Sequence, residues 1–139
     1  MSIEGPADLL AAAVAAREHA YAPYSGYRVG AAARGASGRI YAGVNVENAS
    51  YPVGVCAEAS ALSAMVLGGD VSLVEIAVTA EGAELVTPCG ACRQRIFEFG
   101  GRHARVWAAD AQAYRRSFTA EELLPFGFGP HAMQPRDPR

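Results

Sequence analysis

The N-terminal part of the chain combines one helix-like segment with a stretch that breaks helices. Residues 8–20 are rich in alanine and leucine, and Pro6 stands where a proline favours the start of a helix. Pro23 and Gly26 follow this segment, which indicates a turn at its end. We therefore predict a helix over residues 8–20.

Two strand-like segments come next. Residues 27–35 and 39–47 alternate moderately between apolar and polar side chains, with Ala-Ser-Gly at 36–38 between them. This pattern predicts a β-hairpin. The later elements are predicted, in order, as a helix that ends in glycines, a strand, another helix, a strand, and a short strand followed by a short helix: residues 56–69, 73–80, 89–101, 104–110 and 115–125.

The order of these elements predicts the fold class. Residues 73–80 have the continuous apolar character that is typical of a central strand covered on both faces. Helices that alternate with strands after a hairpin indicate an α/β fold, a three-layer α-β-α sandwich with a mixed sheet of about five strands. With 139 residues, we expect one domain over residues 1–139, whose proline-containing tail at about 131–139 frays.

Composition and charge narrow the classes of function. Hydrophobic residues make up 51% of the chain and charged residues 19%, as in globular proteins. The formal net charge of −2 disfavours binding to a phosphate backbone, so we expect no nucleic-acid partner. The first residues lack the pattern of a signal peptide, and the apolar run at residues 9–16 is too short to span a bilayer. A cytoplasmic protein without a membrane partner is the expectation.

Three cysteines supply the first candidate chemistry. Cys89 and Cys92 have the spacing with which two thiolates reach one metal ion from the first turn of a helix, and Cys56 starts the preceding predicted helix. An odd number of cysteines in a cytosolic chain argues against a disulfide framework. Three protein ligands with one open position are typical of a catalytic zinc site, so we predict one Zn²⁺ held by these thiolates.

Glu58 changes the interpretation from a metal site to a catalytic one. It lies two residues after Cys56, within a stretch that is otherwise free of charge from Asn48 to Gly69. A carboxylate beside zinc-bound water can take its proton and pass it to a substrate. Cys-x-Glu followed by Pro-Cys-x-x-Cys, here Pro88 to Cys92, is the signature of zinc-dependent nucleobase deaminases, in which the glutamate is not a ligand. A structural zinc site or a redox pair remains as the alternative, but a redox pair leaves Cys56 and Glu58 unexplained.

From about residue 8 to residue 130 the chain resembles the homotetrameric cytidine deaminases. Besides the zinc motifs, the segments AYAPYSGYRVGAA, GVNVENASYP and LLPFGFGP resemble family segments in the right order. The resemblance implies hydrolytic deamination of cytidine and 2′-deoxycytidine to uridine and 2′-deoxyuridine, with release of ammonia, in pyrimidine salvage. It also implies one zinc ion per subunit and a homotetramer whose active sites are completed by neighbouring subunits.

The resemblance assigns a role in substrate binding to several residues. Asn45 and Glu47 match the pair that hydrogen-bonds the ribose hydroxyls, and as residues i and i+2 at the end of a strand they point the same way. Local capping of a turn is the alternative for this pair. Tyr27 stands where the family usually has a phenylalanine on the base, and Phe128 matches an aromatic residue that reaches a neighbour's site. Ordinary packing is the alternative for both aromatic residues. The complete predicted set of substrate contacts is Tyr27, Asn45, Glu47, Ala49, Tyr51, Ala57 and Phe128, of which Ala49 and Tyr51 approach the adjacent subunit's substrate.

Ala59 departs from the family pattern. Many members carry an arginine directly after the catalytic glutamate, where it hydrogen-bonds the ligand sulfurs. Three thiolates on Zn²⁺ leave a net charge of −1, which weakens the ion as a Lewis acid unless donors draw charge from the sulfurs. Our hypothesis is that backbone N–H groups at the two helix starts supply most of this compensation. Arg93 or Arg95 is the alternative donor, although a solvated or interface position is favoured for Arg95.

Three rival functions remain open on the sequence. A deaminase for another aminopyrimidine nucleoside, such as blasticidin S, shares both zinc motifs, but the NVENAS segment favours a plain ribose. A polynucleotide editor needs a basic surface, which the pI of about 5.9 disfavours. A zinc-stabilised binding module without activity would bind zinc but release nothing from cytidine. The sequence does not distinguish cytidine from 2′-deoxycytidine as the preferred substrate.

Overall fold

The centre of the computed structural model, which describes residues 1–133, is one mixed five-stranded sheet. The strand order is β2-β1-β3-β4-β5, and only the β3–β4 pair is parallel. The bounds of the strands are Val29–Gly35 for β1, Ile40–Val44 for β2, Leu73–Ala80 for β3, Arg105–Ala109 for β4 and Tyr114–Thr119 for β5. The apolar strand at 73–80 is β3, and it lies in the middle of the sheet, as its composition predicted.

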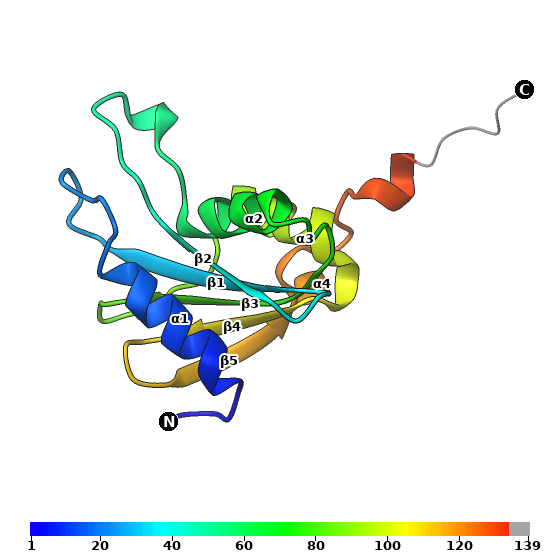
Figure 1. Cartoon of the computed structure of the whole chain (residues 1–139), viewed down its shortest axis with the longest axis horizontal. Helices are drawn as coiled ribbons and strands as arrows, with labels where there is room; N and C mark the ends of the chain where they lie inside the picture. Colours follow the sequence, from blue (N-terminus) through cyan, green and yellow to red (C-terminus); the bar gives the residue numbers. More distant parts are fainter. Residues whose placement is uncertain (134–139) are drawn as a thin grey trace, which may run out of the picture.

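Helices cover both faces of the sheet (Figure 1). Helix α1 (Ala7–Arg17) lies on one face, while α2 (Ala57–Leu67) and α3 (Gly90–Gly100) lie on the other, with the short α4 (Ala120–Leu123) beside α3. Alternate residues of β1 pack against the two helical layers. Ala32 packs against α1, whereas Ala31 and Ala33 pack in the cluster under α2 and α3. The predicted three-layer α-β-α sandwich is confirmed.

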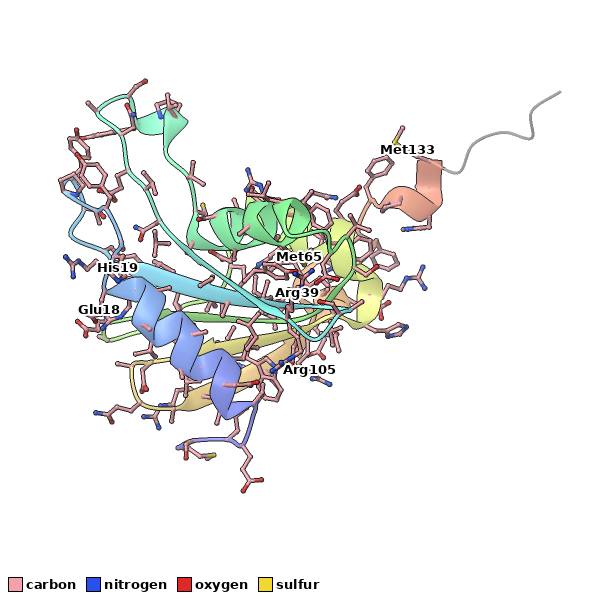
Figure 2. The ribbon with its side chains drawn as sticks, in the orientation of Figure 1. Glu18, His19, Arg39, Met65, Arg105 and Met133 are labelled. Atoms are coloured by element: carbon pink, nitrogen blue, oxygen red, sulfur yellow. The ribbon has the colours of Figure 1, made fainter. Side chains whose placement is uncertain are left out.

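Helix α2 lies unusually close to the sheet at Gly43. A Cβ atom added to Gly43 would stand 2.2 Å from the backbone nitrogen of Ala61 and 2.6 Å from the carbonyl oxygen of Ala57. Only a residue without a side chain permits this approach. Met65, one turn further along α2, is fully buried between the helix and the sheet (Figure 2). The start of α2 is therefore held at a fixed height above β2.

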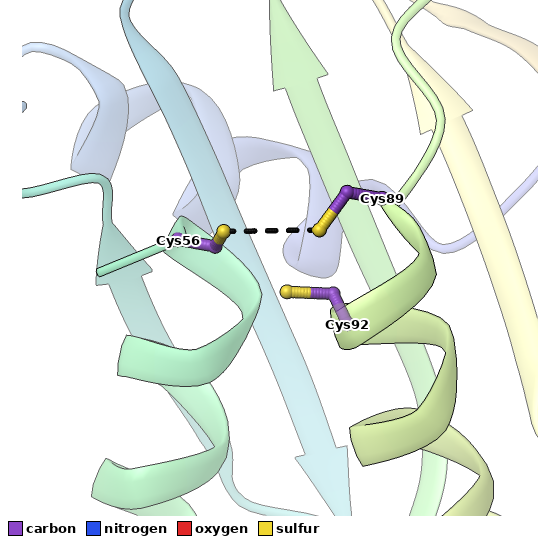
Figure 3. Close-up of side chains that lie close together, drawn as sticks. All are labelled: Cys56, Cys89 and Cys92. Carbon is purple, nitrogen blue, oxygen red and sulfur yellow. Dashed lines mark hydrogen bonds between the residues drawn. The ribbon is translucent and has the colours of Figure 1, made fainter. Parts of the chain in front are cut away.

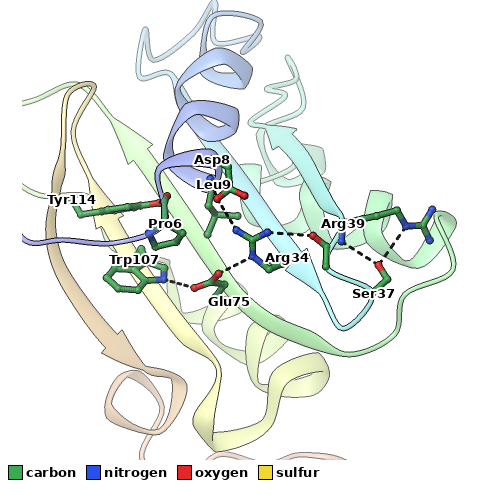
Figure 4. A network of polar contacts seen from close by, with 10 residues as sticks. Pro6, Asp8, Leu9, Arg34, Ser37, Arg39, Glu75, Trp107 and Tyr114 are labelled. Carbon is green, nitrogen blue, oxygen red and sulfur yellow. Dashed lines mark hydrogen bonds and ion pairs between the residues drawn. The ribbon is translucent and has the colours of Figure 1, made fainter.

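A polar network ties α1 to the face of the sheet that it covers (Figure 4). The Arg34 guanidinium contacts Asp8 at 2.7 Å and Glu75 at 2.8 Å, and Trp107 Nε1 donates to the other oxygen of Glu75 at 2.9 Å. The Tyr114 hydroxyl donates to the carbonyl oxygen of Pro6 at 2.7 Å. These contacts are remote from the cysteines, and we assign them to stability.

A predicted helix and a predicted strand end earlier than expected, and the start of the predicted tail forms a turn. The helix predicted over 8–20 ends at Arg17, and the strand predicted over 39–47 ends at Val44. The second strand ends there because Asn45 Oδ1 accepts the Val29 backbone N–H at 2.9 Å, so a side chain replaces the backbone partner. In the predicted tail, Pro130–Met133 forms a 3₁₀ turn, and residues 134–139 lie outside the described residues. No helix in the described part of the chain is long and apolar enough to cross a membrane.

Candidate active site and metal centre

The three cysteine sulfurs converge between the starts of two helices (Figure 3). Cys56 is the N-cap residue of α2, Cys89 is the N-cap residue of α3, and Cys92 lies in the first turn of α3. All three Sγ atoms lie within 4.8 Å of one another, and those of Cys56 and Cys89 are 3.9 Å apart. Both helices direct the positive ends of their dipoles toward this point, which favours thiolates.

This donor set fits a single zinc ion. Tetrahedral zinc with bonds of about 2.3 Å to sulfur places two sulfurs about 3.8 Å apart, close to the Cys56–Cys89 separation. Soft thiolates select zinc over magnesium or calcium. Three ligands leave the fourth position open, as in a catalytic site. The zinc centre predicted from the spacing therefore assembles in the fold.

The thiols need a cation to ionise together. Burial, followed by the charge of Cys89, raises the pKa of Cys56, and burial together with Glu58 and the other two sulfurs raises the pKa of Cys92. Burial also raises the pKa of Cys89, yet the Cys92 backbone N–H and the sulfur contacts lower it more, so that the net shift is downward. Three adjacent thiolates repel one another, and a bound divalent cation reverses that repulsion.

Glu58 lies in the first turn of α2, beside the sulfurs, and lines the cleft. It is the second residue of α2 and only 5% exposed. Burial raises the pKa of Glu58, while its own backbone N–H and the Arg95 guanidinium act in the opposite direction. A carboxyl group whose pKa is moved toward neutrality can both accept and return a proton.

A cleft of about 390 Å³ opens above these residues. That volume is within the usual range for a site that binds a small molecule. Eight of the eleven residues predicted for the site line it: Tyr27, Asn45, Glu47, Tyr51, Cys56, Ala57, Glu58 and Cys89. Cys92 is fully buried beneath it. The apolar wall that Val29 and Val86 contribute was missed from the sequence, because the apolar residues of strands and loops look alike wherever they are buried.

Asn45 and Glu47 already hold the loop on which Tyr27 lies. Asn45 Nδ2 donates to the Tyr27 carbonyl oxygen at 2.8 Å. Glu47 Oε1 accepts the backbone N–H groups of Tyr24 and Ser25, each at 3.0 Å, and Glu47 Oε2 accepts the Ser25 hydroxyl. These bonds, with the Ser25 hydroxyl first, lower the pKa of Glu47. Local capping, the alternative interpretation of this pair, is thus present beside the cleft and does not exclude substrate contact.

Ala49 and Phe128 do not reach the cleft of their own chain. Ala49 is exposed in the loop after β2, and Phe128 is 59% exposed beyond α4, where its carbonyl oxygen accepts Gln94 Nε2 at 2.6 Å. Tyr51 lines the cleft at one edge yet is 73% exposed, with its ring 5.7 Å from that of Tyr24. Within one chain, the structure therefore leaves these three side chains open to solvent.

The two arginines of α3 have different partners. The Arg93 guanidinium donates to the carbonyl oxygens of Pro88 at 2.7 Å and Leu123 at 3.1 Å, which fixes the loop before Cys89. Arg95 Nη1 lies 3.6 Å from Cys92 Sγ. Arg95 is an exposed residue, in line with the solvated position favoured from the sequence, and its guanidinium nevertheless turns back along the helix to the sulfur three residues earlier.

Comparisons with known proteins agree with this site. Residues 4–108 match the family model described as the cytidine and deoxycytidylate deaminase zinc-binding region. The chain is 42% identical over 120 residues to a cytidine deaminase of Halalkalibacterium halodurans, which covers 86% of this chain and 91% of the relative. A crystal structure of cytidine deaminase from Burkholderia pseudomallei is similar with a TM-score of 0.84 and 42% identity over 90% of this chain and 100% of the other. One from Mycobacterium tuberculosis has a TM-score of 0.75 and 37% identity over 88% and 95% of the two chains.

Proposed function

The chain belongs to the cytidine and deoxycytidylate deaminase family, and from this membership we propose that it hydrolyses cytidine to uridine and ammonia with one zinc ion per subunit. The observation that carries the proposal is the buried Glu58 carboxyl group beside three converging sulfurs at the floor of a nucleoside-sized cleft. When bound, zinc supplies Lewis-acid activation of a water molecule near neutral pH.

Glu58 moves the protons of this reaction. Its carboxylate takes a proton from the attacking water and delivers it to N3 of the base, while the water oxygen forms a bond to C4. Glu58 then carries the second proton of that water to the amino group, the bond from C4 to nitrogen breaks, and ammonia leaves. Cytidine and water thus become uridine and ammonia, and the carboxyl group returns to its starting state.

The sugar end of the cleft favours a nucleoside with a 3′-hydroxyl. Asn45 and Glu47 lie on the wall of the cleft, and after their contacts with the loop each still has hydrogen-bonding capacity toward a hydroxyl. Cytidine and 2′-deoxycytidine both carry a 3′-hydroxyl, so we propose that both are substrates. Tyr27 presents an aromatic face at the same cleft for the base.

A nucleoside should be strongly preferred to a nucleotide. Among the described residues that line the cleft, none is basic, while Glu47 and Glu58 are acidic. At the sugar end of the cleft, a phosphate group therefore lies near the Glu47 carboxylate and meets no positive partner in the lining.

We expect ammonia release and loss of cytidine absorbance with cytidine, and at least about tenfold lower kcat/KM with cytidine 5′-monophosphate. Parallel assays of the two compounds with one preparation measure this, and equal turnover would contradict the assignment. A zinc-loaded, folded protein that releases no ammonia from either compound would instead support the silent binding module.

Oligomerisation and location complete the proposal. Exposed aromatic residues flank the site, and Phe126 is fully exposed with a φ of 57°, a conformation that is strained for a residue with a bulky side chain. With Phe128 and Tyr51 also exposed, these features support contacts between copies of the chain, and the homotetramer in which neighbouring subunits complete each cleft is what the resemblance to the family implies. The three free thiols suit the reducing cytoplasm, where we place the reaction.

Replacing Arg95 tests how the charge of the thiolates is balanced. Arg95→Ala removes the cation 3.6 Å from Cys92 Sγ, so we expect zinc affinity or kcat to fall about 10- to 100-fold, as for other residues that support metal ligands. Chelator competition at fixed pH measures the affinity, and Arg95→Lys, which keeps the charge, should lose less. Unchanged zinc affinity and kcat in Arg95→Ala would return this role to backbone N–H groups such as that of Cys92.

A further inference from the structure

We propose that Ser25 is a positioning residue that fixes the one acceptor position Glu47 presents to the 3′-hydroxyl of the substrate. The inference rests on the proposed function, since it concerns the sugar end of the same cleft. Ser25 does not line the main cleft and carries no role from its residue type alone. Its hydroxyl nevertheless contacts Glu47 directly.

The hydrogen bonds of Glu47 leave little capacity free. A carboxylate accepts about four hydrogen bonds, two on each oxygen. Oε1 already accepts two backbone N–H groups, those of Tyr24 and Ser25. Oε2 accepts the Ser25 hydroxyl, which leaves about one position on Oε2 for a hydroxyl of the substrate. Ser25 therefore determines both the orientation of the carboxylate and the place of its remaining acceptor position.

The direction of the Ser25 bond is set by its other partner. Ser25 Oγ accepts the Tyr27 backbone N–H at 3.0 Å, so the single proton of the hydroxyl is free to point at Glu47. On the other side of the same residue, Asn45 Nδ2 donates to the Tyr27 carbonyl oxygen. One serine thus links the acceptor for the sugar to the backbone that carries Tyr27.

The turn itself does not depend on the Ser25 side chain. The backbone N–H groups of Tyr24 and Ser25 still anchor the turn to Glu47 without the hydroxyl, and the Gly26 N–H donates to the Ala22 carbonyl oxygen at 2.9 Å. Gly26 supplies the positive φ of 70° that the turn requires. Ser25 is exposed, so removal of its hydroxyl leaves no buried polar group without a partner. Loss of the acceptor for the Tyr27 N–H should affect every substrate alike, because Asn45 Nδ2 still holds the Tyr27 carbonyl oxygen, and only the effect on Oε2 depends on a hydroxyl of the substrate.

The test compares cytidine with 3′-deoxycytidine. With Ser25→Ala, we expect kcat/KM for cytidine to fall about tenfold, the usual cost of one hydrogen bond to a charged group. For 3′-deoxycytidine, which lacks the hydroxyl that Oε2 would accept, the loss should be much smaller. The ratio of the two kcat/KM values therefore decreases about tenfold. A purely structural role of Ser25 would lower both values equally and leave this ratio unchanged.

Matched variants make the outcome decisive. Ser25→Thr keeps a hydroxyl and should keep the wild-type ratio, whereas Ser25→Cys, with a thiol of similar size that donates weakly, should lower it. Ser72→Ala, an exposed serine before β3, should change neither substrate. If the wild-type protein is active and Ser25→Ala and Ser25→Cys leave the ratio of the two kcat/KM values unchanged, the role of Ser25 is overturned while the proposed function stands. A wild-type protein that deaminates neither compound overturns the proposed function, and the role of Ser25 with it.

Discussion

Glu58→Gln is expected to lower kcat with cytidine by at least about 10²–10⁴-fold while the protein keeps its zinc and its fold. Glutamine has the same shape as glutamate, but its amide can neither accept the proton of the attacking water nor return it to the leaving amino group. Burial already disfavours the charged form of Glu58, so a neutral side chain of equal size should not lower the melting temperature.

Single-turnover and steady-state assays with cytidine, together with zinc content and thermal melting, measure this result. Glu98→Gln is the matched control, because Glu98 lies exposed on α3 and should tolerate the same substitution without loss. Near-normal turnover by a zinc-loaded Glu58→Gln protein would remove Glu58 from the chemistry. Loss of zinc in the same variant would instead make the carboxylate a metal ligand.

Removal of zinc is expected to abolish turnover and to lower the melting temperature. Without the cation, the raised pKa values of Cys56 and Cys92 leave these thiols protonated, and the activation of water is lost. Turnover should return in proportion to zinc added after dialysis against a chelator, and Mg²⁺, which prefers oxygen ligands, should not restore it.

Metal content, ammonia release and thermal melting of the same samples test this expectation. Across samples, activity should be proportional to the bound zinc and should reach its maximum at one zinc ion per chain. A metal-free sample that retains full activity would exclude a catalytic metal. A metal-free sample that loses activity without any change in melting temperature would show that the ion contributes nothing to stability.

The fold was predictable where one local pattern decides the structure. The continuous apolar run at 73–80 predicted a central strand, and the small, apolar stretch before Gly68 favoured a buried helix. The early end of β2 could not be read from propensities, because it depends on the Asn45 side chain reaching Val29 across the strand pair. A contact between side chain and backbone at this distance along the chain has no signature in spacing.

In the candidate site, too, local spacing predicted some features, while others depend on the three-dimensional structure. Short spacings predicted the convergence of the three cysteines beside Glu58, because each helix start fixes the direction of the side chains in its first turn. The contact of Arg95 with Cys92 depends on a rotamer of a long side chain, which composition does not determine. Ala49 and Phe128 lie exposed and outside the cleft of their own chain, and the sequence pattern contains no direct sign of that placement.

The zinc centre has a topological consequence for the chain. Its ligands come from two helices, and Cys56 and Cys89 are 33 positions apart with the whole of β3 between them. A bound ion therefore closes a long loop around the central strand, as a removable crosslink would. The unfolded chain must close a loop of this length before the sulfurs can meet, at a cost of about 3–4 kcal/mol in chain entropy, so the ion binds the folded chain far more tightly and stabilises it by mass action. The ion that activates the water thus also restrains the chain against opening, so occupancy of the site and lifetime of the folded protein rise and fall together.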